Sequence, residues 1–346
     1  MRALIEASNA VVGVSDGYVV EPAGEFDVVL RIPDGELRPG LINSHDHLHR
    51  NHYGRLGLPP YANAYQWGRD IHAREQDRIA VGRALPRREA LLRGAWKNLL
   101  AGVTTVVHHD AWEADFERNF PIDVVPLLSV HSLGFQRESL PAEPCPALAI
   151  HLAEGIDREA ADEIRALDAR GLLAACLLAV HVVGADADGI HRLRQSGAAV
   201  VWCPTSNEYL FGCTAPAELL APGTDVLLGS DSLLTAAGSL LDELRRARVL
   251  GLLSDARLVD AVSTVAARRL HIAAPSYEVG ARANLVVLRR ELLEASEEDV
   301  ALVVCNGTIR VLDPCLFGAR SALADAGRIV PSGATTRWIY DRDLSV

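Results

Sequence analysis

Short apolar runs alternate with longer segments in which apolar residues recur at helical spacing through most of the chain. The apolar runs lie at 103–107, 124–130, 147–150, 172–180, 199–202 and 225–229. The segments with helical spacing lie at 85–101, 187–195, 240–250 and 254–270. Continuous apolar runs of this length are typical of strands buried on both faces. Their alternation with amphipathic helices predicts an α/β protein with parallel β/α units, arranged as a (β/α)8 TIM-like barrel.

Both ends of the chain follow a different pattern. Short β-like stretches at 17–20 and 27–32 are separated by turn residues, and similar stretches recur at 284–288, 301–304 and 309–312. We therefore expect a small β-sandwich built from residues 1–40 and 276–346, beside a hydrolase barrel at 41–275. Only about sixteen residues separate His131 from Ala147, too few for a usual strand and helix pair. The third and fourth β/α units are thus predicted to be shortened or merged.

Histidines and an aspartate follow several of the predicted strands. His45 and His47 end an apolar run, and residues two apart in a strand point to the same face. Neutral imidazole is a good ligand for zinc, iron and nickel. His151, His181 and Asp231 each follow a further strand. Nitrogen and oxygen donors at successive strand ends can enclose one divalent ion and leave a position open for water.

Other polar and aromatic residues near these strand ends are candidates for catalysis or substrate binding. Glu154 lies three residues after His151, on the loop that leaves the strand, where a carboxyl group can move a proton between water and substrate. His108 and His109 follow another strand and either line the pocket or stabilise a turn. Trp67 belongs to an aromatic, proline-containing stretch that forms either a lid over a planar substrate or a packed loop.

Composition excludes several classes of function. The chain of 346 residues has a formal charge of −11, which argues against a protein that tracks nucleic-acid phosphates. Its six cysteines include no Cys-x-x-Cys pair, and this favours free thiols in a reducing compartment. No apolar run is long enough to span a bilayer, and we recognise no signal peptide. We expect a cytoplasmic protein that binds no membrane.

The ordered motifs together resemble the amidohydrolase superfamily, within it the branch of cytosine, guanine and S-adenosylhomocysteine deaminases and triazine hydrolases. The matching segments are 39–47, 102–106, 151–154, 203–207, 229–232, 266–270 and 279–288, with His181 between them. The resemblance implies His45, His47, His151 and Asp231 as ligands of one metal ion, zinc or iron. It also implies Glu154 and His181 as proton-transfer and substrate-orienting groups, and self-association as a dimer or larger homo-oligomer.

Besides the shortened third and fourth units, the chain departs from the family pattern at two residues, Lys97 and Asn284. Binuclear members carry a carboxylated lysine on a mid-barrel strand, whereas the single lysine here, Lys97, lies on the predicted helix before Val103. We therefore predict a site for one metal ion. Asn284 stands where the family has Asp in a structural motif, a change without consequence for the chemistry.

These observations predict an enzyme that activates water to attack an sp² carbon of a C–N bond. In this hypothesis Asp231 and His181 accept the proton of water, and Glu154 protonates a ring nitrogen. Ammonia is the expected leaving group, which makes the protein a deaminase of a small amino-substituted heterocycle. Hydrolysis of a cyclic amide, or of a chloro- or amino-triazine, would use the same residues. From another class, a catalytically silent metal-binding barrel would have lost ligands or the proton-transfer group, but all of them are present.

Overall fold

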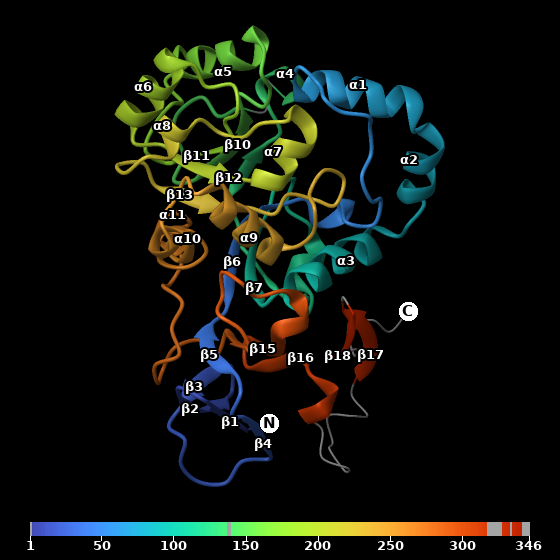
Figure 1. Ribbon diagram of the computed structural model, residues 1–346, viewed down its shortest axis with the longest axis vertical. Helices are drawn as coiled ribbons and strands as arrows, with labels where there is room; N and C mark the ends of the chain where they lie inside the picture. The colour runs from blue at the N-terminus through green and yellow to red at the C-terminus, as the bar shows by residue number, and fades with distance from the viewer. Residues whose placement is uncertain (1, 137–139, 317–326, 333, 341–346) are drawn as a thin grey trace.

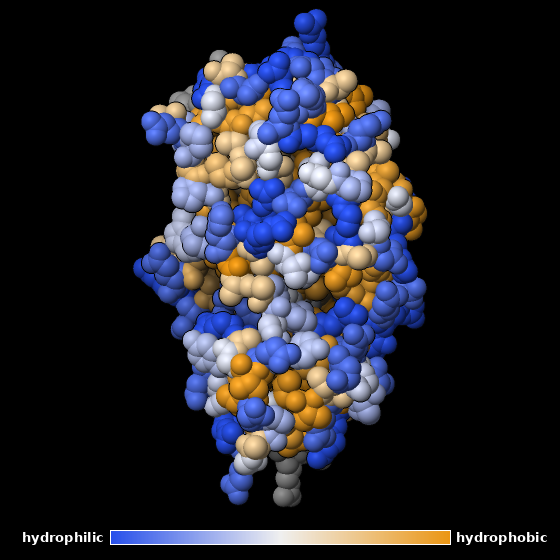
Figure 2. Space-filling model, turned by 90° about the vertical axis from the view of Figure 1, so that its left-hand side faces the viewer, coloured by the Kyte–Doolittle hydropathy of each residue, from blue (hydrophilic) through white to orange (hydrophobic). Residues whose placement is uncertain are grey.

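The computed structural model describes residues 2–136, 140–316, 327–332 and 334–340. Figure 1 shows two regions along the long axis, one of parallel strands surrounded by helices and one of mostly antiparallel sheets near both termini. In the described residues, no helix has the length and the apolar run needed to cross a bilayer. On the face shown in Figure 2, hydrophilic and hydrophobic side chains are mixed in small groups.

The first region has a TIM-barrel-like arrangement of short parallel strands. One sheet has the order β6-β7-β8 and the other the order β13-β12-β11-β10-β9. Between β6 and β13, the Asp231 amide donates to the His45 carbonyl at 3.0 Å. The described residues form no continuous ladder around all eight strands. The strands are β6 (Leu41–Asp46), β7 (Val103–His108), β8 (Asp123–Val124), β9 (Leu128–Val130), β10 (Leu148–Leu152), β11 (Leu177–His181), β12 (Ala199–Trp202) and β13 (Val226–Leu228).

Strands β8 and β9 follow each other without an intervening helix. The two lie on one stretch, 123–130, whose first part pairs with β7 and whose second part pairs with β10, both in parallel. A single extended segment therefore occupies the place where a regular barrel has two strands and a helix. This arrangement explains how so few residues connect β7 to β10.

Eleven α-helices are described, and most of them surround the parallel strands. Asn63, Asp157, Asp186 and Ser254 cap four of them by accepting a hydrogen bond from a backbone amide of the first turn. The helices are α1 (Ala64–Arg74), α2 (Gln76–Arg83), α3 (Arg87–Leu100), α4 (Leu133–Gln136), α5 (Arg158–Asp168), α6 (Ala187–Ser196), α7 (Pro204–Phe211), α8 (Ala217–Leu220), α9 (Leu240–Leu250), α10 (Asp255–Ala261) and α11 (Thr264–Arg269). Short 3-10 turns include η1 (Leu48–Arg50), η2 (Ala114–Glu117), η4 (Glu297–Asp299) and η5 (Pro314–Leu316).

Two predicted elements are shorter than the sequence pattern suggested. The helix expected at 254–270 is divided into α10 and α11, because the Val262 carbonyl between them accepts a hydrogen bond from Ile42 of β6 at 2.9 Å. The apolar run at 172–180 becomes a strand only from Leu177. Its first residue, Leu172, instead donates to the Leu167 carbonyl at the end of α5, at 3.2 Å.

Side chains on the parallel strands alternate between two apolar clusters. In β11, Leu178 and Val180 belong to one cluster, together with Ile42 and Ala149 of other strands. The residues that alternate with these, such as Leu177 of β11 and Leu152 of β10, belong to a larger cluster that also contains residues of the helices. This alternation follows from the two-residue period of a strand. It places His151 of β10 on the same face as Ala149, in the interior of the strand arrangement.

The termini contribute two sheets with a shared apolar cluster. The four-stranded sheet has the order β3-β2-β1-β4 and the six-stranded sheet the order β17-β18-β16-β15-β14-β5. Buried residues of both sheets, such as Ile5, Leu37, Leu285 and Trp338, pack in this cluster. The strands are β1 (Ala3–Ala7), β2 (Val11–Ser15), β3 (Tyr18–Val20), β4 (Val28–Ile32), β5 (Glu36–Pro39), β14 (Leu285–Leu288), β15 (Val300–Cys305), β16 (Thr308–Leu312), β17 (Gly327–Ser332) and β18 (Thr335–Tyr340).

Candidate metal centre and active site

His45 and His47 lie at the end of β6 and are almost completely buried. Their ring centroids are 5.1 Å apart, as expected for side chains two residues apart on one face of a strand. Gly229 lies directly beside His45, and a Cβ atom at that position would be 2.5 Å from the His45 Cβ. The Gly-Ser-Asp motif of the β13 loop thus needs its glycine for the close approach of β13 to β6.

Two further predicted ligands lie next to these histidines. The Nε2 atom of His151, on β10, is 3.3 Å from Nε2 of His45. The Oδ1 atom of Asp231 is 3.7 Å from Nε2 of His45 and 3.9 Å from Nε2 of His47. Two nitrogen ligands at about 2.0–2.1 Å from a tetrahedral ion lie roughly 3.3 Å apart. The spacing between His45 and His151 therefore fits a shared ion.

The protonation states also suit a divalent metal ion. Burial lowers the pKa of all three histidines. The pKa of His45 falls, that of His47 falls to about 3, and that of His151 falls well below the usual range. The rings are thus neutral, which is the form that binds metals. Burial by itself would raise the pKa of Asp231, but the hydrogen bond and the charges of the neighbouring histidines bring it well below its usual range. The donor set is then three neutral imidazoles and one carboxylate.

His181 ends β11 with a change in backbone direction. By strand alternation its side chain would follow Leu177 and Ala179 away from the interior. Its φ of 72°, in the left-handed region, interrupts the strand, and its ring lies 5.3 Å from that of His151. His181, His45 and His151 form a group whose ligand atoms all lie within 4.8 Å of one another. The position of His181 is therefore compatible with metal binding as well as with proton transfer.

Asn207 determines which nitrogen of His181 faces the site. The Asn207 amide oxygen is 2.8 Å from Nδ1 of His181. Because an amide oxygen only accepts hydrogen bonds, Nδ1 carries the proton and Nε2 remains available. From the sequence we expect Ser206 and Asn207 to organise the turn after their strand. Instead, the Asn207 side chain orients His181, and the Ser206 hydroxyl donates to Asp231.

Glu154 lies beside the metal-ligand candidates and lines the cavity. Its Oε1 is 3.7 Å from Nε2 of His181, and its side chain is 11% exposed. Burial raises its pKa to about 7, although the proximity of His181 opposes the shift. A carboxyl group with this pKa exchanges a proton readily near neutral pH.

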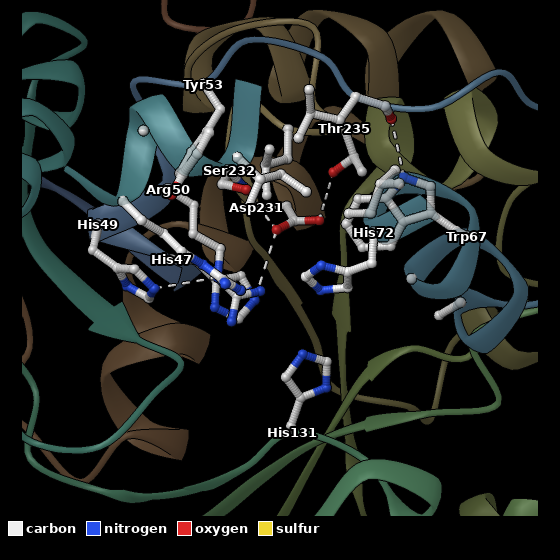
Figure 3. A pocket seen from close by; sticks show the side chains of 18 of the residues that line it. His47, His49, Arg50, Tyr53, Trp67, His72, His131, Asp231, Ser232 and Thr235 are labelled. Carbon is white, nitrogen blue, oxygen red and sulfur yellow. Dashed lines mark hydrogen bonds and ion pairs between the residues drawn. The ribbon is translucent and has the colours of Figure 1, made fainter. Parts of the chain in front are cut away.

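The carboxylate of Asp231 is oriented by three hydrogen bonds. The Ser206 and Thr235 hydroxyls donate to its Oδ2 at 2.8 and 2.9 Å, and the Ser232 amide donates to its Oδ1 at 2.7 Å. Figure 3 shows Asp231 between His47 and Thr235, with its carboxylate directed into the open centre of the cavity. Asp231 has a left-handed φ of 51°, a conformation in which aspartate is enriched.

Asp110 orients His47 from behind. Its Oδ2 is 2.7 Å from Nδ1 of His47, so the ring donates from Nδ1 and directs Nε2 towards Asp231. A carboxylate behind a metal-binding histidine both selects the tautomer and strengthens the ligand. Arg50 donates to the other oxygen of Asp110 at 3.3 Å. The sequence analysis did not assign these roles, because nothing in the local pattern links residue 110 to residue 47.

The candidate site opens into a cavity of about 1020 Å³. His47, His151, His181, Glu154 and Asp231 line its floor. His72 and His131, two residues that the sequence analysis did not select, also line the cavity (Figure 3). The His131 ring stacks on that of His47, with 6.1 Å between the centroids.

The three predicted substrate contacts have different positions. Trp67 lines the cavity and donates to the Leu56 carbonyl at 3.0 Å. His108 and His109 lie outside the lining, since His108 accepts from the Leu48 amide at 3.3 Å and His109 contacts the Val130 carbonyl at 3.0 Å. The His109 ring stacks on that of His151 at 4.1 Å. His109 therefore supports the ligand candidate His151 from behind, and His108 stabilises the turn that begins at Leu48.

Comparisons with known proteins agree with the motifs. A stretch of 102 residues is 42% identical to aminodeoxyfutalosine deaminase of Deinococcus radiodurans and covers 28% of this chain and 24% of that protein. A stretch of 171 residues is 32% identical to 5-methylthioadenosine/S-adenosylhomocysteine deaminase of Halobacterium salinarum and covers 41% of this chain and 39% of that protein. The matched regions thus span about a quarter and two fifths of these curated relatives.

A solved structure and a family model also match this chain. The crystal structure of an adenosine deaminase from Xanthomonas campestris with bound zinc has a TM-score of 0.65 and 20% identity, and the match covers 93% of this chain and 95% of that one. At this identity the likeness concerns the fold. Residues 147–310, which include His151, Glu154, His181 and Asp231, match the family model described as the amidohydrolase family. As the ordered motifs predicted, this part of the chain matches the amidohydrolase family.

Proposed function

We propose that the protein is a metal-dependent hydrolase that removes ammonia from an amino-substituted heterocycle. The observation that carries this proposal is the position of Glu154, a buried carboxyl group with a pKa of about 7, 3.7 Å from His181 and beside the cluster of ligand candidates. The matched relatives are named as deaminases, which supports ammonia as the leaving group.

His45, His47, His151 and Asp231 would hold one divalent metal ion, with zinc as the first candidate and iron as the second. A divalent ion in such a site lowers the pKa of water and makes it a nucleophile near neutral pH. His181 would add a fifth donor or orient the substrate, since Asn207 engages its Nδ1 and leaves its Nε2 directed towards Glu154. The zinc named in the Xanthomonas campestris structure supports the choice of metal.

The side chains account for each proton that the reaction requires. Asp231, ionised and oriented by Ser206 and Thr235, accepts a proton from the attacking water, with His181 beside it. Glu154 donates a proton to the ring nitrogen next to the attacked carbon. As the C–N bond breaks, the amino group leaves as ammonia with the proton that Asp231 took from water. The proton of the remaining hydroxyl group passes to the Glu154 carboxylate, so that the ring carries an oxo group and Glu154 is protonated again.

A screen for ammonia tests this function. Zinc-loaded and iron-loaded protein would be incubated with aminopurines, aminopyrimidines and aminotriazines, and ammonia would be measured together with chloride and free amine. Release of ammonia from at least one ring class is expected. Release of chloride or amine without ammonia, or no product from any of the rings, would contradict the deaminase assignment.

Two predictions about organisation accompany this function. We propose the division into a barrel at 41–275 and a small β domain from 1–40 and 276–346, which the two terminal sheets and their shared apolar cluster support. Self-association as a dimer or larger oligomer stays a prediction from the family resemblance.

A further inference from the structure

The lining of the cavity carries charges of both signs. Among the residues that the structure describes, the acidic ones in its lining are Glu154 and Asp231, on the floor. Four arginines line the remaining wall, from η1 to the start of α3: Arg50, Arg69, Arg83 and Arg87. This positive wall lies in a chain whose formal charge is −11, so it does not follow from the overall composition.

The four arginines differ in their partners. Arg87 pairs with Glu113, and Arg50 shares Asp110 with His47. Within the described ranges, Arg69 on α1 and Arg83 on α2 form no ion pair or side-chain hydrogen bond, and both are exposed to solvent. Their guanidinium groups are therefore available to an incoming anion, which can accept paired hydrogen bonds from arginine.

The space beside these arginines exceeds what a bare ring requires. The main cavity, about 1020 Å³, is at the upper end of the roughly 300–1,000 Å³ that proteins use for drug-sized ligands. A second cavity of about 470 Å³ lies next to it, and His72, Ile79 and Arg83 line both. Apolar side chains such as Leu56 and Trp67 line the main cavity too. A ligand can thus extend from the polar floor past apolar side chains to Arg83.

From this arrangement we propose that the substrate is an amino-heterocycle with an anionic substituent, a carboxylate or a phosphate, which Arg69 and Arg83 bind. This inference rests on the proposed function for the position of the ring at the floor. The arginines select the substrate through charge-assisted hydrogen bonds, and the reacting carbon remains at the opposite end, next to Glu154 and Asp231.

Three probes with the same ring and sugar test the proposal. Adenosine is neutral, adenosine 5′-carboxylate carries one negative charge, and adenosine 5′-monophosphate carries a phosphate. Calorimetry on the metal-loaded protein should give a Kd at least about tenfold lower for one charged probe than for adenosine. The better of the two charged probes identifies the anion. Equal affinity for all three, or no binding by any of them, would overturn the proposal.

Substitutions of Arg69 and Arg83 test whether these two arginines cause the preference for a charged probe. The double variant Arg69→Met with Arg83→Met should lose the preference for the charged probe and keep its affinity for adenosine. Arg74→Met is the matched control, because Arg74 is an exposed arginine of α1 that pairs with Asp70 and does not line the cavity. A double variant that still prefers the charged probe would also overturn the proposal.

Ammonia release separates this inference from the proposed function. If adenosine is deaminated as efficiently as its charged derivatives, the deaminase function holds and the anion site is wrong. If a charged probe binds through Arg69 and Arg83 and no ammonia appears from any ring, the anion site holds and the deaminase function is wrong.

Discussion

Lys97 and Asp46 form an ion pair inside the protein, with Nζ of Lys97 2.9 Å from Oδ2 of Asp46 and side-chain exposures of 8% and 0%. Lys97 also donates to the Asp231 carbonyl at 2.8 Å. Asp46 lies between His45 and His47, so the single lysine of the chain connects the two-histidine strand end to the residue that supplies the carboxylate.

We expect Lys97→Met to destabilise the fold and the metal site together. Removing one partner of a buried ion pair leaves the other charge uncompensated and costs about 3–5 kcal/mol. Urea unfolding of the metal-loaded protein would measure this loss. Arg93→Met is the control, since Arg93 lies on the same helix and its pair with Glu89 is exposed; its effect should stay within about 0.5 kcal/mol. An equally small change for Lys97→Met would contradict the structural role.

Asp110→Asn should weaken metal binding without unfolding the protein. An amide can present its NH₂ group to His47 and lacks the negative charge that strengthens the ligand, and changes of this kind reduce metal affinity by about 10- to 100-fold. Competition with a chromophoric chelator measures the affinity. Asp115→Asn, which affects an aspartate paired with Arg88 on the same connection, should leave it unchanged. Unaltered metal affinity in Asp110→Asn would contradict the role of Asp110 in orienting His47.

The pH dependence of turnover should report Glu154. Burial raises the pKa of Glu154 to about 7, and the carboxyl group must be protonated to donate. We therefore expect kcat to fall as the pH rises through about 7. Glu154→Gln should reduce kcat by about 10²- to 10⁴-fold and abolish this limb of the profile. The exposed Glu218 offers a matched control, and Glu218→Gln should retain both the value of kcat and the fall in kcat near pH 7. Full turnover in Glu154→Gln would exclude the proposed proton donor.

Glu243 should make the fold less stable at alkaline pH. Burial raises the pKa of Glu243 to about 8, although hydrogen bonds from Thr205 oppose the shift. Between the unfolded value of about 4.3 and 8, the folded protein retains a proton that the unfolded chain has lost. The free energy of unfolding therefore decreases as the pH rises through this window. Urea unfolding at pH 5 and pH 8.5 should show a smaller difference in Glu243→Gln, and an identical difference would contradict the shift.

The metal content of the purified protein distinguishes an enzyme from a silent barrel. We expect about one equivalent of zinc or iron per chain when the protein is purified without chelator. Removing the ion should lower the melting temperature, because a ligand that binds only the folded state stabilises it. Less than about half an equivalent, with no change in melting temperature on adding zinc, would favour the silent scaffold.

Many of the elements near the site could be predicted from the sequence. The helix at 240–250 and the strand at 199–202 have the bounds of α9 and β12, because local apolar periodicity and glycine stops are enough to define them. The merged strands β8 and β9 were indicated by the shortage of residues before β10. The boundaries at Val262 and Leu172 were missed, since each depends on a hydrogen bond to another element.

The chain by itself determined which donors could share an ion: strand periodicity points His45 and His47 to one face, and strands that run parallel bring their following residues to the same edge. Only the tertiary structure decided how these donors are directed. The left-handed φ of His181, the contact between Asp110 and His47, and the position of Lys97 beneath Asp46 each depend on residues distant in sequence. Such contacts leave no periodic signal, because they arise only when packed elements meet.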